Sequence, residues 1–326
     1  MLAARIHEDG GPDVIRVEEV PDPVAGPGEV LVRLRAASLN HLDVWVRKGL
    51  PSVPKPRILG ADGSGVVEAL GEGVDGLYVG QRVVLNPGLE HGDTITVVGE
   101  HRDGTHAELI AIADAQVFPL DDGLSFEVAA AFPLVYETAY RMLVTRADVQ
   151  EGEWALIWGI GGGVATAAFE ICRALGVRTI VTSSDDDKLA RAVEWGADVG
   201  VNHEKADVVA AVRETTGTGV DVVVETVGEA TWKHSLRALR PGGTIVVSGS
   251  TSGPNPPADL QRVFFLQLNV VGSTMGTKTE LAQLARLLET TGIRPQIDRE
   301  LPLADAREGF AALAAGDVFG KIVFTP

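Results

Sequence analysis

The feature that most constrains the fold is an alternation, from about residue 124 onward, of short apolar runs with longer segments of helical period. The short runs are rich in Val, Ile and Thr, as in RTIVTS and VDVVVET, and the predicted helices cover residues 164–175, 186–195 and 230–239. Continuous apolar strands that alternate with helices are typical of a parallel sheet covered on both faces. The pattern therefore predicts a doubly wound α/β domain.

The first third of the chain has a different sequence pattern, in which short β runs are separated by Pro- and Gly-rich turns. The predicted strands are residues 3–7, 15–19, 29–34, 63–69, 82–85 and 107–113. Such spacing favours a β-barrel or sandwich. After Gly276 a predicted helix, residues 279–290, leads to the closing strand KIVF, and we assign this tail to the first domain. The predicted domains are thus 1–122 with 275–326, and 123–274.

Composition narrows the class of protein. The chain has 326 residues with 45% hydrophobic and 22% charged residues, which fits two folded domains. A formal net charge of -17 opposes binding to nucleic acid. No apolar run approaches the roughly 20 residues that span a bilayer, and the N-terminus has no signal-peptide pattern, so we expect a cytoplasmic protein without membrane contact. Cys172 is the only cysteine, which excludes an intrachain disulfide and a site of several thiolates.

A glycine-rich turn lies between a predicted buried strand and a predicted helix, and it contains Gly159, Gly161, Gly162 and Gly163 before Val164. Glycines allow a tight turn and a close approach of the backbone to a pyrophosphate, which the helix N-terminus attracts. The spacing departs by one residue from G-x-G-x-x-G. A tight turn without a ligand is the alternative, but the place of the turn at the head of the alternating series favours a dinucleotide site.

The next strand ends in Ser183-Ser184, where dinucleotide sites that prefer NAD carry an acidic residue. A hydroxyl can donate to a 2'-phosphate, and Lys188 lies nearby, so we expect NADP(H) to be preferred, with NAD(H) possible. One side chain of the Asp185-Asp186-Asp187 run could instead turn back to the ribose. We prefer to interpret that run as a helix start, with Asp at the N-cap and in the first turn.

Several segments together resemble the medium-chain dehydrogenase/reductase superfamily, over essentially the whole chain. They are GEVLVRLRAASLNHLDVWVRKG, LGADGSGVVEALGEGVDGLYVGQRVVLNPG, the glycine-rich turn, VVVETVG, ALRPGGTIVVSGS and FGKIVF. The most similar group is quinone oxidoreductase-like, often labelled zinc-type alcohol dehydrogenase. The resemblance implies a GroES-like β-barrel catalytic domain, a Rossmann domain with a doubly wound parallel sheet, a cleft between them and hydride transfer from a nicotinamide cofactor. It also implies a homodimer or homotetramer, with NVVGST at the interface.

The chain departs from the zinc-dependent members of this superfamily at three positions. Those members carry Cys, His and commonly Cys where this chain has Asn40, Ala61 and Leu134. These three side chains cannot build a catalytic zinc site, so we expect no zinc. The cysteine-bearing lobe of many relatives is also missing after Asn86. We interpret His91, His101 and His106, which lie in or just beyond its place, as exposed loop histidines.

Without a metal, a quinone or an α,β-unsaturated carbonyl is easier to reduce than a simple ketone, because the developing charge falls on a conjugated oxygen. We therefore expect a zinc-independent, NADPH-dependent oxidoreductase that acts on such small molecules. By resemblance Asn40 and His41 line the nicotinamide pocket, where Asn40 would donate to the carbonyl oxygen and His41 would relay a proton. Alternatively Asn40 caps a short helix in which Asp43 pairs with Arg47.

Tyr136 is the third catalytic candidate, as a proton donor or a stacking surface, and a buried packing role is equally open. By resemblance Thr138 contacts the nicotinamide carboxamide. The other contacts with the cofactor that the resemblance implies are Val227, Gly228, Gly249, Ser273, Thr274 and Lys321. Two alternative functions stay open: an alcohol or aldehyde dehydrogenase with a proton relay at His41, and a non-catalytic nucleotide-binding protein of the kind represented by lens crystallins.

Overall fold

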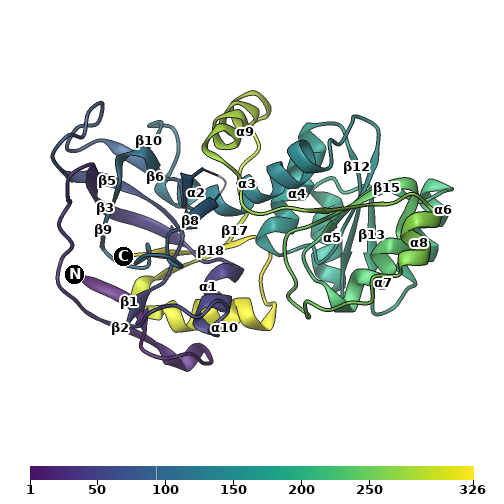
Figure 1. The fold of residues 1–326 in the computed structure, drawn as a ribbon, viewed down its shortest axis with the longest axis horizontal. Helices are drawn as coiled ribbons and strands as arrows, with labels where there is room; N and C mark the ends of the chain where they lie inside the picture. Colours follow the sequence, from purple (N-terminus) through teal and green to yellow (C-terminus); the bar gives the residue numbers. More distant parts are fainter. Residues whose placement is uncertain (93) are drawn as a thin grey trace. The chain divides into compact units, whose positions relative to one another are not determined.

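The computed structural model describes residues 1–92 and 94–326, which divide into two units. The first is Met1–Leu134 with Arg294–Pro326 and contains both chain ends; the second is Val135–Ile293 (Figure 1). Both divisions come later in the chain than the sequence places them. Helix α9 (Lys278–Thr291) therefore falls in the second unit, whereas the sequence assigns it to the first. The reason is Glu280, which accepts hydrogen bonds from Thr145 and from Arg141 at 2.9 Å within that unit.

The first unit is built on antiparallel β structure, as the Pro- and Gly-punctuated runs predict. Its main sheet has the order β10 (Val117–Pro119), β6 (Arg82–Leu85), β5 (Asp62–Leu70), β3 (Glu29–Ser38), β18 (Lys321–Thr325) and β17 (Ile297–Pro302), and β9 (Leu109–Ala113) also pairs with β3. The strands β2 (Ile15–Glu19), β1 (Leu2–Ile6) and β4 (Arg57–Ile58) form a second sheet, and β7 (Gly88–His91) with β8 (Thr94–Val97) forms a hairpin. All six strands predicted in the first third are present.

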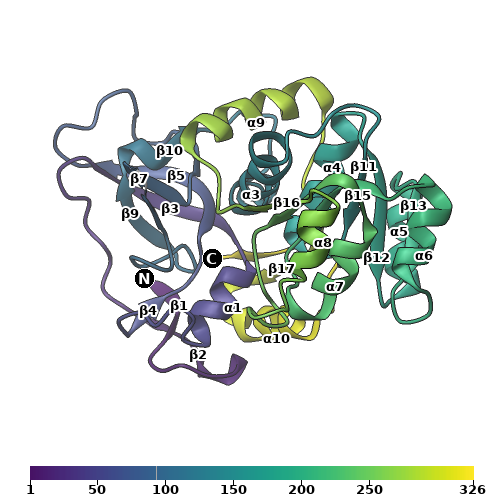
Figure 2. The same cartoon turned by 45° about the vertical axis from the view of Figure 1, so that its right-hand side comes forward.

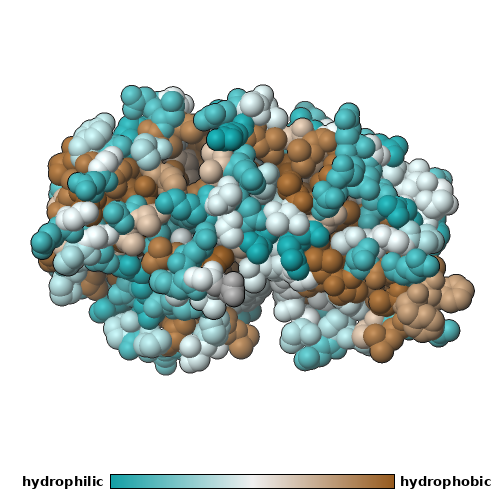
Figure 3. Space-filling view, turned by 45° about the horizontal axis from the view of Figure 1, so that its top comes forward, coloured by the Kyte–Doolittle hydropathy of each residue, from teal (hydrophilic) through white to brown (hydrophobic). Residues whose placement is uncertain are grey.

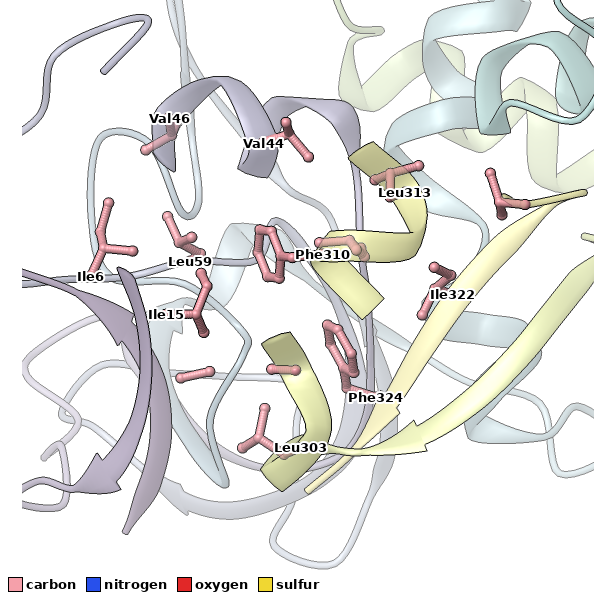
Figure 4. Packing of buried hydrophobic residues seen from close by; sticks show 14 of the residues in the cluster. Ile6, Ile15, Val44, Val46, Leu59, Leu303, Phe310, Leu313, Ile322 and Phe324 are labelled. Atoms are coloured by element: carbon pink, nitrogen blue, oxygen red, sulfur yellow. The ribbon is translucent and has the colours of Figure 1, made fainter. Parts of the chain in front are cut away.

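The helices of this unit contribute to two hydrophobic clusters. The helices are α1 (His41–Arg47), α2 (Phe126–Ala130) and α10 (Ala306–Ala315), with short 3-10 turns at Pro12–Val14, Asp114–Gln116 and Leu303–Asp305. Figure 4 shows Phe310 of α10 and Phe324 of β18 pointing into the same cluster as Val44 of α1 and Ile6 of β1. Because Ile322 and Phe324 both belong to this cluster, a shift of β18 by one residue would carry both side chains out of it.

The second unit contains the predicted parallel sheet. Its order is β13 (Val199–Asn202), β12 (Arg178–Ser183), β11 (Trp154–Ile157), β14 (Val220–Glu225), β15 (Leu239–Val247) and β16 (Asn269–Gly272). The helices are α4 (Gly163–Ala174), α5 (Asp186–Glu194), α6 (Val208–Thr216), α7 (Glu229–Ala238), α8 (Leu260–Phe265) and α9, and Figures 1 and 2 show helices on both faces of the sheet. Helix α3 (Pro133–Tyr140) continues into a π-helical turn at Arg141–Arg146. The sequence did not predict β13, α6 and α8.

The strand order places a ligand crevice at a definite point of this sheet. If the six strands are numbered 1 to 6 along the chain, their order across the sheet is 3-2-1-4-5-6, which is the Rossmann order. All strands are parallel, but the order in which the chain adds them changes direction between β11 and β14. In such sheets ligands bind beyond the carboxyl ends of the strands at the reversal. Among the described residues, no helix is long and apolar enough to cross a membrane.

Candidate functional site

The glycine-rich turn follows β11 at the reversal point. Gly159 has φ +67° and Gly161 has φ +120°, conformations that side chains rarely adopt. Thr182 at the end of β12 fixes the turn: its hydroxyl accepts from Gly159 N at 3.1 Å and its carbonyl from Ile160 N at 2.7 Å. A Cβ added at Gly159 would meet no atom within 4 Å. The turn is therefore both tight and open on the side of Gly159.

Gly162 is the N-cap of α4, and Gly163 and Val164 open its first turn. Among the residues that the structure describes, no side chain caps this helix end. The N–H groups of a first helical turn and the helix dipole attract an anion. An uncapped twelve-residue helix behind a turn with open space fits the pyrophosphate of a dinucleotide, so these residues fit the nicotinamide cofactor that the fold implies.

At the end of β12 lie the serine side chains that the sequence predicts to face the ribose, followed by the acidic run. Ser183 is buried, and its hydroxyl accepts from Asp185 N at 3.0 Å, while Ser184 is exposed. Asp185 caps α5 by accepting from the backbone N–H groups of Asp187 and Lys188 at 2.8 and 3.3 Å. This confirms the helix-start interpretation of the acidic run for Asp185.

Asp186, the second member of that run, is also occupied. Its carboxylate accepts from Asn202 Nδ2 at 2.6 Å and pairs with Lys205. These contacts hold the pKa of Asp186 below its usual value. Two of the three carboxylates therefore have partners in α5, in β13 or in the turn after β13.

A buried carboxylate orders the turn after β14. Glu225 is fully buried and accepts from Val227 N at 2.8 Å and from Gly228 N at 3.0 Å. Thr231 and Ser235 of α7 donate to the same carboxylate. The sequence did not single out Glu225, although an acidic residue that ends an otherwise apolar strand is a usable signal for a buried hydrogen-bond centre.

The other predicted cofactor contacts of this unit follow neighbouring strands. Gly249 comes after β15, where an added Cβ would lie 2.9 Å from the carbonyl oxygen of Thr226. Ser273 and Thr274 come after β16, and Ser273 N donates to the carbonyl of Val247 at 2.8 Å. Because parallel strands end at the same edge, the sheet brings these turns and the glycine-rich turn to one side.

Tyr136 and Thr138 lie on α3 and are both buried, with Tyr136 only 1% exposed. The phenol of Tyr136 donates to Glu170 of α4. Burial and the neighbouring carboxylate raise the pKa of Tyr136 well above its ordinary value. This geometry favours the packing alternative for Tyr136, because its hydroxyl proton is held by Glu170.

In the first unit, Asp62 at the start of β5 is the centre of a buried polar cluster. Its Oδ2 accepts from Asn40 Nδ2 at 2.9 Å and from Ser38 Oγ at 3.1 Å, and its Oδ1 accepts from Leu134 N at 2.9 Å. Lys321 Nζ lies 3.4 Å from the same Oδ2 and donates to Asn40 Oδ1. Asp62 is fully buried and Lys321 is 3% exposed. The sequence identified neither Asp62 nor this contact of Lys321.

Asn40 is the N-cap of α1, as one alternative predicts, and its backbone N–H donates to Asp43 Oδ2 at 2.8 Å. The other oxygen of Asp43 accepts from Gly60 N at 2.8 Å. The ion pairs of the described residues do not include the predicted one between Asp43 and Arg47, so that expectation is wrong. Burial raises the pKa of Asp43 to about 7, against the opposing effect of the two backbone donors.

His41 is the first residue of α1 and is partly buried. Burial lowers its pKa to about 4, and the charges of Lys321 and Lys48 act in the same direction. Burial also lowers the pKa of Lys321, while the carboxylates of Asp62 and Asp43 oppose this. At neutral pH His41 is therefore an uncharged imidazole, which donates a hydrogen bond from one nitrogen and accepts at the other.

The three loop histidines do not share one environment. His91 and His101 are exposed, as predicted, but His106 is fully buried, so the prediction for that residue is wrong. Its ring lies edge-on to Phe310 and Phe324, with centroids 5.8 and 5.0 Å away. Burial lowers the pKa of His106 to about 3. The residue lies just before β9, so the fold of the sheet and not the loop decides its surroundings.

The residues of this cluster do not fit a catalytic zinc ion. Ala61 and Leu134 offer no side-chain electron pair, and Asn40 and Asp62 already accept from the ammonium of Lys321. Among the described residues, no group of three or more His, Cys, Asp and Glu side chains is placed to hold a metal. Cys172 is buried in the other unit, where burial raises its pKa to about 12.

Comparison with known proteins identifies the family. Residues 26–122 match the family model of the alcohol dehydrogenase GroES-like domain, and residues 163–290 match that of the zinc-binding dehydrogenases. The quinone oxidoreductase of Pseudomonas aeruginosa is 33% identical over 97% of this chain and 97% of its own. The chain belongs to the medium-chain dehydrogenase/reductase superfamily. Its GroES-like and Rossmann parts confirm the predicted fold class, and it is an NAD(P)H-dependent oxidoreductase.

Relatives in this superfamily differ in what their names say they do. The human quinone oxidoreductase is 28% identical over 99% of this chain and 97% of its own. A crystal structure described as an NAD-dependent alcohol dehydrogenase is 42% identical, with a TM-score of 0.95 over the full length of both chains. A mycobacterial protein solved with NADPH is 30% identical, with a TM-score of 0.88 over both full chains.

Proposed function

We propose that this chain is an NADPH-dependent, zinc-independent oxidoreductase that transfers hydride to a quinone or an α,β-unsaturated carbonyl compound. The observation that carries the proposal is the buried ammonium of Lys321, which contacts Asp62 and Asn40, and Asn40 is one of the three positions at which the resemblance implies a zinc ligand in zinc-dependent relatives. A site of this composition lacks a Lewis acid for a simple carbonyl. A conjugated acceptor needs less help, because the negative charge falls on an oxygen that hydrogen bonds can stabilise.

The second unit supplies the nucleotide site in this proposal. The turn of Gly159 to Gly163 would hold the pyrophosphate, and the nicotinamide, when bound, would supply the hydride. Ser183 and Ser184 offer hydroxyls, without a carboxylate, to the ribose, which supports the preference for NADPH. A Ser183→Asp variant tests this point, because a new carboxylate should shift the preference towards NADH.

The first unit supplies the groups that act on the acceptor. A neutral imidazole at His41 donates a hydrogen bond to the acceptor oxygen as charge develops on it, and it remains uncharged at neutral pH because its pKa is near 4. Asn40 is a second candidate donor. One amide N–H is bonded to Asp62 at 2.9 Å, and the contact of Nδ2 with the carbonyl of Ser38 is long, at 3.5 Å.

The experiment is a matrix of acceptors and nucleotides on the purified protein. Consumption of NADPH is followed with 9,10-phenanthrenequinone and with an enone, each repeated with NADH, and alcohol oxidation is followed with NADP⁺ and NAD⁺. The proposal predicts the largest kcat/KM for NADPH with a quinone or enone. Turnover of alcohols alone contradicts it, and binding of NADPH without turnover of any acceptor indicates the non-catalytic alternative.

Alcohol dehydrogenase activity is the second candidate. It is favoured by the solved NAD-dependent alcohol dehydrogenase, which is 42% identical over its full length. In this case His41 would accept the hydroxyl proton of the alcohol, and a base with a pKa near 4 is a weak one. That mismatch is our reason for ranking reduction of a conjugated acceptor first.

We also propose that the partner of this chain is a second copy of itself, bound through α8 and β16. β16 is an edge strand of the parallel sheet, with open backbone groups. Leu260, Phe264 and Phe265 of α8 are 71%, 70% and 77% exposed, and Val270 of β16 is 48% exposed. Figure 3 shows hydrophobic residues gathered at the right-hand end, where Figure 1 shows α8. An apolar patch beside an open sheet edge fits an interface between identical chains.

A further inference from the structure

Lys321 has a local environment that a surface lysine does not have. It is the first residue of β18, and the residues that follow it, Ile322 and Phe324, are locked in the hydrophobic core. The strand therefore leaves the lysine little freedom, and 97% of its surface is covered. Two acceptors meet its ammonium, Asn40 Oδ1 and, at 3.4 Å, Asp62 Oδ2. A buried ammonium is tolerated only with such partners.

The donor and acceptor character of these two partners fixes the orientation of the Asn40 amide. An ammonium only donates, so the Asn40 atom that faces it is the carbonyl oxygen. A carboxylate only accepts, so the amide nitrogen faces Asp62, at 2.9 Å. Rotation of the amide by 180° would set two donors against each other and two acceptors against each other. Lys321 and Asp62 together therefore hold Asn40 in one orientation.

We propose that Lys321 is a positioning residue: its ammonium fixes the Asn40 amide and places an internal positive charge near His41. This role replaces the cofactor contact that the resemblance implied for Lys321. The kinetic part of the inference rests on the proposed function, whereas its spectroscopic part does not.

The charged and titratable groups around this point come from four elements. Asp43 and His41 belong to α1, Asp62 to β5, His106 to the segment before β9, and Lys48 follows α1. Lys321 acts on His41, His106 and Asp43 alike, in each case favouring the less positive form of the group. Removal of the Lys321 charge should therefore raise the pKa values of His41, His106 and Asp43.

The test compares Lys321→Met with Lys321→Arg and with the control Lys48→Met. Lys48 also acts on His41 but is exposed, and among the described residues its side chain forms no hydrogen bond with Asn40 or Asp62. NMR follows the titration of His41 and the side-chain amide signals of Asn40. For Lys321→Met we expect the pKa of His41 to rise by about one unit and the Asn40 signals to shift or broaden. Lys48→Met should raise the pKa of His41 by less and leave the Asn40 signals unchanged.

Affinity for NADPH separates the positioning role from a cofactor contact. We expect Lys321→Met to bind NADPH within about threefold of the unmodified protein, but to lose about 10- to 100-fold in kcat with the acceptor, as for a misplaced catalytic group. Lys321→Arg should restore part of kcat, because it keeps the charge. A tenfold loss of NADPH affinity with unchanged His41 and Asn40 signals would overturn the inference.

The unmodified protein provides a readout that does not depend on a variant folding. With ¹⁵N-labelled lysine, the Nζ–H protons of Lys321 should exchange slowly with water at neutral pH, because the ammonium is buried and hydrogen-bonded. Exchange as fast as that of surface lysines contradicts the inference. Failure of the proposed function is distinguishable from both results: the spectroscopic changes then persist in a protein that reduces no quinone or enone.

Discussion

Two buried side chains of the first unit, His106 and Asp43, link its stability to pH in opposite directions. The pKa of His106 is about 3 in the folded protein, below the ordinary 6.5, so at intermediate pH only the unfolded chain takes up the proton. Its contribution is complete above pH 6.5 and is lost as the pH falls towards 3. The pKa of Asp43 is about 7, above the ordinary 3.8, so its contribution is present below pH 3.8 and is lost as the pH rises to 7.

The measurement is the free energy of unfolding in urea at several pH values between 4 and 8, for the unmodified protein and for His106→Gln. Glutamine keeps a polar side chain of similar size but does not titrate. We expect the variant to lose less stability than the unmodified protein between pH 6.5 and pH 4. Parallel curves over that range would show that His106 is not the source of the acid sensitivity.

At the site, the sequence predicted individual residues, but it did not predict which of their side chains contact each other. The sequence identified Asn40, His41 and Lys321 through the resemblance, and the glycines through their place between strand and helix. Lys321 and Asn40 are 281 positions apart, and Lys321 and Asp62 are 259 apart, so no local spacing connects them. Likewise, the expected pair of Asp43 and Arg47 obeyed helical spacing, but the carboxylate satisfies two backbone N–H groups instead.

At the scale of elements, the glycine-rich turn can be tested against a matched turn elsewhere. Gly159 and Gly217 both have positive φ, +67° and +78°, and an added Cβ meets no atom within 4 Å at either. Alanine should cost each a similar stability, about 1–2 kcal/mol. Only Gly159→Ala should weaken NADPH binding, by about tenfold or more, because its methyl group enters the open space of the proposed pyrophosphate site. Thermal unfolding and calorimetric titration with NADPH measure the two effects.

Equal NADPH affinity in Gly159→Ala and the unmodified protein would place the pyrophosphate elsewhere. A loss of affinity in both alanine variants would show that general destabilisation, and not the turn itself, is responsible. Gly217 ends α6, so its substitution reports on the backbone cost alone.

Elements with strong periodicity were predicted, and weak ones were not. The helix predicted at 186–195 is α5 (Asp186–Glu194), and the one predicted at 279–290 is α9 (Lys278–Thr291). The missed β13 is four residues long and contains Gly200, so it lacks a clear apolar run. The missed α8 has its apolar side chains exposed, which is the reverse of the pattern by which a helix is found.

For the whole molecule, the domain count and the discontinuous first unit follow from the sequence, but the division points do not. The predicted boundaries at 122 and 274 follow changes in the pattern of predicted strands and helices. The two units of the structure instead divide after Leu134 and after Ile293. Side-chain contacts decide this: Tyr140 donates to Gln283 of α9 at 3.3 Å, and Glu280 accepts from Arg141. Contacts of this kind leave no mark in local composition.

The proposed interface predicts the mass of the particle in solution. Light scattering should give two or four times the 34.3 kDa of one chain, and Phe265→Asp should reduce it towards a single chain, because a buried charge opposes association. Val24→Asp is the matched control: Val24 is 85% exposed in the other unit and lies outside the α8 patch. A monomeric unmodified protein, or an assembly unaffected by Phe265→Asp, contradicts the proposal.

The most direct test of the account is the rate of NADPH oxidation with a quinone by protein from which metals have been removed exhaustively, with residual zinc measured by mass spectrometry. Because Lys321 occupies the space between Asn40 and Asp62, we predict a rate equal to that of the untreated protein, with no change when zinc is added back. Loss of the rate on metal removal, with recovery on one equivalent of zinc, would contradict the account.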